Sequence, residues 1–108
     1  MINERNRPIA MIKGDTVSFN MEFTGLSSDL DTAYFSAKAN YSDNTYTFRK
    51  SLNDGITKVS TGVYNVRLAP SDTSNTTPGR YYYDLEIGVN NDIFTIMFGE
   101  INILPEVS

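Results

Sequence analysis

Residues 68–85, LAPSDTSNTTPGRYYYDL, decide the fold, because a polar segment changes there abruptly into a tyrosine-rich strand. Pro78 and Gly79 turn the chain. From residue 81 onward the side chains alternate, since successive residues of a strand point to opposite faces of a sheet. One face carries Tyr81, Tyr83, Leu85 and Ile87, and the other carries Tyr82, Asp84 and Glu86. The pattern predicts a central strand of a β-sandwich, which the chain enters over a corner.

The start of this strand, GRYYY at residues 79–83, resembles the Gly-x-Tyr-x-Cys element of immunoglobulin domains, with Tyr83 in the place of the cysteine. The resemblance implies that the ring of Tyr81 fills the core while its hydroxyl bonds to backbone within residues 74–77, forming a tyrosine corner. We therefore assign Tyr81 a structural role rather than a role in stacking on a ligand.

The same two-residue alternation recurs along the chain, and no segment of useful length has a helical period. It predicts seven or eight strands, at residues 8–12, 15–23, 32–40, 45–50, 56–59, 62–69, 81–87 and 93–104. In the last strand, Phe94, Ile96 and Phe98 are in phase, whereas Ile101 and Ile103 are in the opposite phase. A β-bulge at Gly99 is predicted to absorb the extra residue, so that both sets face the core.

The predicted fold class is all-β, an immunoglobulin-like antiparallel β-sandwich formed as a single domain over residues 1–108. A chain of 108 residues buries about two-thirds of its unfolded surface in one core. Residues 1–7 are expected to form a flexible N-terminal arm. The expected core comprises Val17, Phe19, Met21, Phe23, Phe35, Phe48, Tyr64, Val66, Leu68, Tyr81, Tyr83, Leu85, Ile87, Phe94, Ile96 and Phe98, and Tyr46 shares the face of Phe48. Truncating Phe19 or Ile96 to alanine is expected to cost about 2–5 kcal/mol.

Composition argues against several classes of function. The formal net charge is −4, and the nine Lys and Arg residues are scattered singly, which disfavours nucleic-acid binding. The chain has no cysteine and no histidine, so it lacks the common thiol nucleophile and general base, and a serine triad cannot be built. No glycine-rich phosphate loop occurs. We therefore expect neither an enzyme nor a bound cofactor.

The N-terminal residues lack the apolar core of a signal peptide, and no window approaches eighteen continuous apolar residues. We expect neither export by that route nor a membrane span.

Most of the thirteen carboxylates lie in predicted turns, where such residues are favoured. Asp29 and Asp31 could hold calcium together with loop carbonyls, but the spacing of an EF-hand is absent, so no metal site is expected. Asp84 and Glu86 both point outward and could be imagined as an acid and base pair, but a solvated strand face explains them. No catalytic residue is assigned.

The order of several motifs resembles the immunoglobulin-like N-terminal domain of tailed-phage baseplate upper proteins, and related modules in other phage and prophage structural proteins. The motifs are KGDT at residues 13–16, AYF at 33–35, KSLNDGI at 50–56, LAPSDT at 68–73, PGRYYYD at 78–84 and GEINI at 99–103. The resemblance spans residues 9–107. It implies a virion component of a baseplate, tail, fibre or capsid, made in the bacterial cytoplasm.

The partners implied by this resemblance are other phage structural proteins or further copies of this chain. Contact is expected through outward sheet faces and edge strands, because a free edge offers unpaired backbone groups to a neighbour. Tyr34 and Tyr82 point outward on the alternation and are the candidate residues for partner contact. The alternative function is a carbohydrate-binding or adhesion module, in which exposed tyrosines stack on sugar rings.

Overall fold

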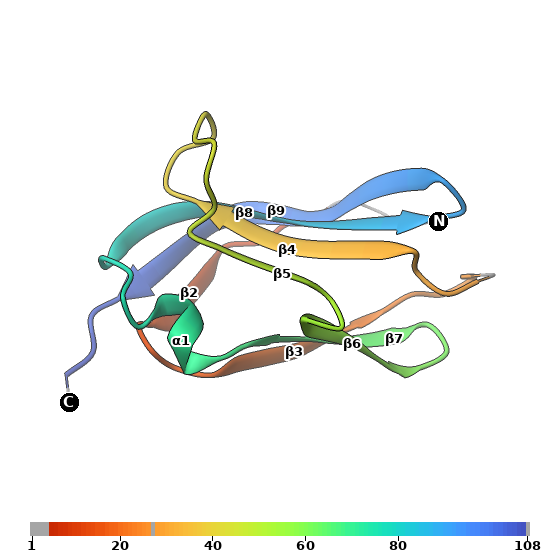
Figure 1. The fold of residues 1–108 in the computed structure, drawn as a ribbon, viewed down its shortest axis with the longest axis horizontal. Helices are drawn as coiled ribbons and strands as arrows, with labels where there is room; N and C mark the ends of the chain where they lie inside the picture. The colour runs from red at the N-terminus through yellow and green to blue at the C-terminus, as the bar shows by residue number, and fades with distance from the viewer. Residues whose placement is uncertain (1–4, 27, 108) are drawn as a thin grey trace.

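The computed structural model describes residues 5–26 and 28–107, and these form nine strands and one short helix (Figure 1). The strands are β1 (Arg5–Asn6), β2 (Ile9–Ile12), β3 (Val17–Glu22), β4 (Thr32–Lys38), β5 (Phe48–Leu52), β6 (Gly55–Ser60), β7 (Val63–Leu68), β8 (Gly79–Val89) and β9 (Asp92–Leu104), and the helix is α1 (Pro70–Thr73). The all-β prediction is confirmed, and the strand beyond the eight expected is the two-residue β1. Within the described residues, no helix is long and apolar enough to cross a membrane.

The strands form two layers, which Figure 1 shows one above the other. One layer has β1 and β2 beside β9, followed by β8, β4 and β5, and the other has β6, β7 and β3. A short parallel pairing joins the layers, where Ser51 lies opposite Gly55 and Leu52 opposite Ile56. Two layers enclosing one core, with β8 central in its layer, make this an immunoglobulin-like β-sandwich.

The sandwich is not antiparallel throughout, in contrast to the prediction. β1 and β2 run parallel to β9, with Ile9 opposite Ile101 and Ile12 opposite Leu104. The chain leaves β2 with the Lys13 N–H bonded to the Leu104 carbonyl and then crosses to β3 in the other layer. The first strands therefore stay beside β9, whose direction they share.

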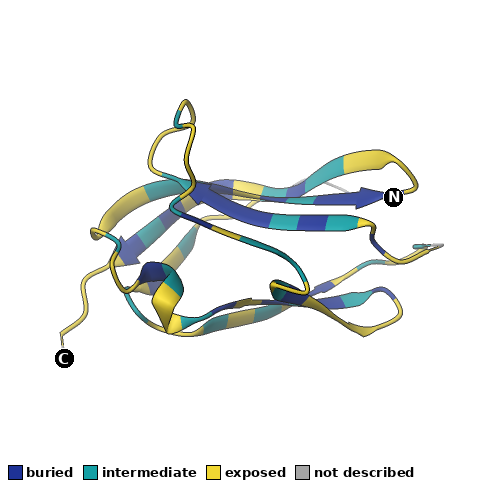
Figure 2. Cartoon of the chain, viewed as in Figure 1, coloured by how far each residue is buried: buried dark blue, intermediate teal, exposed yellow. Residues whose placement is uncertain are grey.

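Phe35 lies at the centre of the core, between the two layers. Its ring makes edge-to-face contacts with Phe19, Phe48 and Tyr83, at centroid distances of 5.8, 5.4 and 5.5 Å. Figure 2 shows that buried residues lie mainly along the strands of both layers, while most of the loops are exposed. On the opposite layer Tyr64 is buried, and its hydroxyl accepts a hydrogen bond from the Leu30 N–H at 3.0 Å.

The predicted bulge exists, but its position in β9 was wrong. Leu85 pairs with Met97 whereas Glu86 pairs with Thr95, so Ile96 is the extra residue. Gly99 remains in register opposite Tyr83. A side chain at residue 99 would collide with the N-terminal segment, since an added Cβ would lie 2.9 Å from the Asn6 side chain and 3.0 Å from the Arg7 carbonyl oxygen. The glycine therefore allows close approach of the first strand.

The shifted bulge changes which residues of β9 are buried. Ile96 is 7% exposed, and Ile101 and Ile103 are buried as expected. Phe98 is 36% exposed, because residues after the bulge are in register with the outward side chains of β8, where it pairs with Asp84. Its assignment to the core was therefore wrong. Five other expected core residues are only half-buried: Val17, Phe19, Phe23, Tyr81 and Phe94.

The expected flexible arm over residues 1–7 is only partly within the described chain, since residues 1–4 lie outside it. Residues 5–7 are not a free arm. Arg5 and Asn6 pair with Met97 and Phe98, and the Arg7 N–H donates to the Phe98 carbonyl at 2.9 Å. The Tyr83 hydroxyl also donates to the Arg7 carbonyl. The free backbone groups of the β9 edge therefore order this segment.

Candidate binding surface

The outer face of the β4, β5, β8 and β9 layer carries a cluster of tyrosine and charged side chains. It is positioned by register: Ala33, Phe35 and Ala37 of β4 point into the core, so the residues between them point outward. Ser36 faces Arg49 on β5 and Asp84 on β8, while Asp84 faces Phe98 on β9. We call this the aromatic surface; its members are Tyr34, Ser36, Lys38, Tyr41, Tyr46, Arg49, Tyr82, Asp84, Glu86, Thr95 and Phe98.

The aromatic surface contains a shallow hollow of about 300 Å³. Ser36 lies on β4 between Arg49 of β5 and Asp84 of β8 and is only 8% exposed. Its small side chain leaves the space that the longer side chains of the surrounding tyrosines and charged residues enclose.

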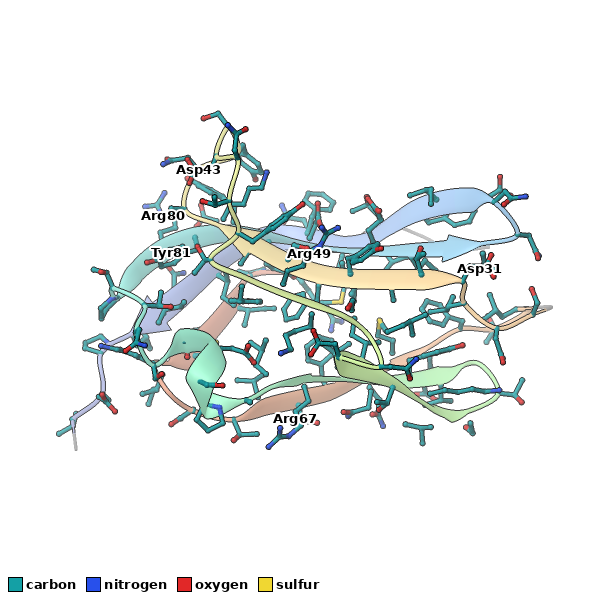
Figure 3. The ribbon with its side chains drawn as sticks, viewed as in Figure 1. Asp31, Asp43, Arg49, Arg67, Arg80 and Tyr81 are labelled. Atoms are coloured by element: carbon teal, nitrogen blue, oxygen red, sulfur yellow. The ribbon has the colours of Figure 1, made fainter. Side chains whose placement is uncertain are left out.

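Arg49 is the central charged group of the surface (Figure 3). Its guanidinium carbon lies 4.0 Å from the ring centroid of Tyr34 and 4.6 Å from that of Tyr46. Lys38 Nζ lies 5.2 Å from the centroid of Tyr46. Such cation–π contacts hold a guanidinium against aromatic rings and leave its N–H groups able to donate at the edges.

A second aromatic pair lies at the other end of the surface. The rings of Tyr41 and Tyr82 stack with centroids 4.5 Å apart and planes at 27°. Tyr41 belongs to the loop over residues 39–47, which stands above the sheet in Figure 1. The loop is braced by hydrogen bonds from the Asn40 N–H to the Asp43 carboxylate and from the Thr47 N–H to the Ala37 carbonyl. Tyr41 is consequently 74% exposed.

Asp84 contributes a negative charge that interacts with Arg49. Burial among the surrounding side chains raises the pKa of Asp84, and the positive charges of Arg49 and Lys38 lower that pKa in part. The residue as a whole is exposed, so the carboxylate is accessible to a partner. Glu86 lies on the same face, opposite Tyr34. A hollow with tyrosine rings, two cations and carboxylates can bind polar and aromatic groups together.

The structure brings the two predicted contact residues onto this one surface. Tyr34 and Tyr82 both point outward from adjacent strands, but each is half-buried because Arg49 covers one and Tyr41 covers the other. The more exposed rings, Tyr41 and Tyr46, were not predicted as contact residues, because Tyr46 was expected to share the face of Phe48 and Tyr41 lies just beyond the predicted strand at residues 32–40. Only the turn residues beside Tyr41, SDN at 42–44, signal a displayed loop.

The sequence predicts that Tyr46 shares the buried face of Phe48, and this prediction was wrong. The strand β5 begins only at Phe48, and Tyr46 in the preceding loop is 43% exposed. It packs on Arg49 instead, which follows Phe48 in β5 and points to the outer face.

Tyr81 lies apart from the aromatic surface. Its hydroxyl donates to the Thr77 carbonyl at 2.6 Å, within the upstream segment that the immunoglobulin resemblance implies (Figure 3).

The two acids considered for calcium binding, Asp29 and Asp31, interact with different partners. Asp29 pairs with Lys58 at 2.9 Å, and Asp31 accepts from the Asn90 N–H at 3.0 Å. Among residues 5–26 and 28–107, no three acidic side chains gather as a metal site would require.

No family model matches the chain. No curated protein sequence matches it either. Among solved structures, it is similar to the extracellular domain of the voltage-gated sodium channel beta4 subunit, described as a parallel homodimer with a role in cell-cell adhesion. The two share 16% identity over 94% of this chain and 93% of that chain, with a TM-score of 0.48. A likeness at this level carries no argument about function.

Proposed function

We propose that this protein is a non-catalytic structural component of a phage or prophage particle that attaches to a neighbouring protein through the aromatic surface. Two observations support the proposal. The order of motifs over residues 9–107 resembles phage baseplate modules, and the surface carries four tyrosines and one arginine, residue types that are enriched at the energetic hot spots of protein interfaces. The observation that carries the attachment role is Arg49 held between Tyr34 and Tyr46.

The geometry of Arg49 makes it suited to binding. An arginine on a free surface loses side-chain freedom when a partner immobilises it, and this loss opposes association. The rings of Tyr34 and Tyr46 already restrict the guanidinium, so less freedom remains to be lost. A partner that offers a carboxylate, a backbone carbonyl or a further aromatic ring would meet a prepared donor.

Incorporation of variants into purified phage particles tests this role. We expect Arg49→Ala to reduce incorporation by about tenfold or more, as the loss of an interface hot spot does. The control is Arg67→Ala, because Arg67 is also exposed but points away from the other layer (Figure 3). Equal incorporation of both variants would show that the aromatic surface does not mediate attachment. Sedimentation of the isolated protein shows whether a further copy is the partner.

The alternative function is carbohydrate binding, and one observation favours it. Tyr46 exposes 43% of its surface beside Arg49, so an aromatic face and charged donors lie together, as a sugar ring requires. A glycan array with the isolated protein separates the two functions. Specific binding that disappears in Tyr46→Ala supports sugar recognition, whereas an array without signal combined with particle incorporation supports attachment.

A further inference from the structure

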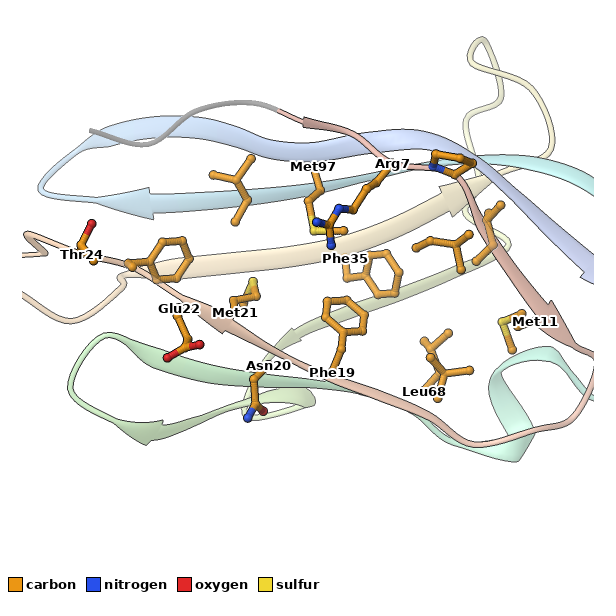
Figure 4. A pocket seen from close by; sticks show the side chains of 16 residues that line it. Arg7, Met11, Phe19, Asn20, Met21, Glu22, Thr24, Phe35, Leu68 and Met97 are labelled. Carbon is orange, nitrogen blue, oxygen red and sulfur yellow. The ribbon is translucent and has the colours of Figure 1, made fainter.

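A groove of about 700 Å³ opens along one side of the sandwich, between β3 and the segment formed by residues 7–8 with the strands β2 and β9 (Figure 4). Apolar side chains from both layers line it: Ile9, Phe19, Met21, Phe23, Ile96 and Met97. Several of these are only partly buried, and the groove extends inward to Phe35 at the centre of the core. None of these six residues belongs to the aromatic surface.

The groove follows from the path of the N-terminal segment. β2 pairs with β9 and then crosses to β3 at residues 13–16, so β2 and β3 lie in different layers. Figure 4 shows the two strands converging near Met11 and separating toward Thr24. Among the described residues β3 pairs with β7 alone. Its other edge therefore faces the groove.

The backbone groups that this edge presents follow from the ladder between β3 and β7. The Phe23 N–H donates to the Gly62 carbonyl at 2.8 Å. Backbone groups in an antiparallel strand alternate in direction, so those of Val17, Phe19 and Met21 also point toward β7. The N–H and carbonyl groups of the intervening residues point the other way, into the open side. These residues are Ser18, Asn20 and Glu22, and all three are exposed.

We propose that this groove binds an extended segment of a partner protein, which adds as a strand to the free edge of β3. Alternate side chains of the added segment would enter the apolar groove, and its backbone would pair with Ser18, Asn20 and Glu22. β3 spans six residues, or about 20 Å, so a matching segment has about six or seven residues. This binding site is separate from the aromatic surface and does not rest on the function proposed for that surface.

The chemistry of the groove selects an extended peptide. A helix satisfies its own backbone hydrogen bonds and would leave the donors and acceptors of β3 unpaired. An added strand supplies those bonds and places every second side chain inward. Its outward residues would lie beside Ser18, Asn20 and Glu22. A basic residue opposite Glu22 is favoured, because opposite charges on neighbouring strands attract and the protein has a net charge of −4.

Binding of synthetic peptides to the whole protein tests the proposal. The probe is a fluorescent nine-residue peptide in which valine alternates with threonine and lysine, and its control has the same composition in a non-alternating order. We expect the alternating peptide to bind at least tenfold more tightly by fluorescence anisotropy. Hydrogen exchange should show new protection at the amides of Ser18, Asn20 and Glu22. Equal binding of the two peptides, or protection confined to other strands, would overturn the proposal.

A matched pair of variants isolates the edge backbone. Asn20→Pro removes the outward N–H at an edge position, where proline is tolerated, and Asn20→Ala removes only the side chain and its bond to Asn65. We expect the proline variant to bind the peptide at least tenfold more weakly than the alanine variant. Glu22→Pro and Glu22→Ala repeat the comparison if Asn20→Pro does not fold. Equal affinity within a folded pair would contradict strand addition.

Discussion

Tyr83 in the middle of β8 donates its hydroxyl hydrogen to the carbonyl of Arg7, which lies 76 residues earlier in the chain. Tyr83 is 3% exposed, and its ring also packs edge-to-face on Phe35. One side chain thus links the centre of the core to the N-terminal segment. The position held by a cysteine in the immunoglobulin element that this strand resembles is used here for a hydrogen bond that orders residues 5–7.

Removing this hydroxyl should loosen the N-terminal segment while leaving the core intact. We expect Tyr83→Phe to lower the free energy of unfolding by about 0.5–1.5 kcal/mol, the usual net value of one hydrogen bond. Hydrogen exchange at Arg7 should accelerate more than exchange in β7, which the bond does not touch. An unchanged denaturation midpoint together with unchanged exchange would show that the bond has no role.

The same residue predicts a loss of stability in alkaline solution. Burial raises the pKa of the Tyr83 hydroxyl to about 12, and the charge of Arg7 lowers it in part. The unfolded tyrosine titrates near pH 10. Because the folded-state pKa is the higher one, the contribution is complete below about pH 10 and is lost as pH rises through about 12. The free energy of unfolding can be measured by urea denaturation between about pH 9 and pH 12, the interval that contains both pKa values. Over this interval it should fall less steeply for Tyr83→Phe than for the parent.

Gly99 should resist substitution because the N-terminal segment occupies the space of a side chain. A Cβ there would lie 2.9 Å from Asn6 Oδ1. The matched control is Gly79→Ala, since Gly79 has a similar φ of 155° but no atom within 4 Å of an added Cβ. We expect Gly99→Ala to cost about 1–3 kcal/mol more than the control, as overpacking does. Equal costs measured by urea denaturation would show that backbone strain alone limits both positions.

Truncations at Ile96 and Phe19 should differ, although the sequence suggests equal costs. Ile96 is 7% exposed beside the bulge, so Ile96→Ala should leave a cavity and cost about 2–5 kcal/mol. Both residues line the groove, but Phe19 is only half-buried, so water can replace its lost ring more readily. We expect Phe19→Ala to cost about 1–2 kcal/mol, mainly from lost apolar burial and its contact with Phe35. A larger loss for Phe19→Ala would mean that the groove is closed in solution.

Asp72 should matter more than a surface carboxylate. One oxygen accepts from the Ala69 N–H at 2.7 Å at the start of α1, and the other lies 3.1 Å from Lys50 Nζ on β5. Both side chains of the ion pair are largely buried. We expect Asp72→Ala to cost about 1–3 kcal/mol, because it removes a helix cap and leaves Lys50 without this partner. Asp72→Asn, which keeps an acceptor, should cost less in the same thermal-unfolding assay.

Much of the fold could be predicted from local patterns. Alternation located the strands within a few residues, because the two faces of a strand are set by each residue and its immediate neighbours. The alternation also placed Tyr34 and Tyr82 on an outward face. It could not predict that Arg49 and Tyr41 cover them, since those contacts join β4 to β5 and β8 to a loop without periodicity.

The strand pattern, the two-layered core and the corner at Tyr81 thus follow from residue order, since each depends on short-range alternation or on one turn. The bulge at Ile96, the outward position of Phe98 and the groove beside β3 depend on the tertiary structure. Gly99 instead stays in register opposite Tyr83, where the close approach of Asn6 and Arg7 leaves no room for a side chain. The groove is open because β2 joins β9 instead of β3. Each is decided by segments far apart in the chain, whose packing no local pattern records.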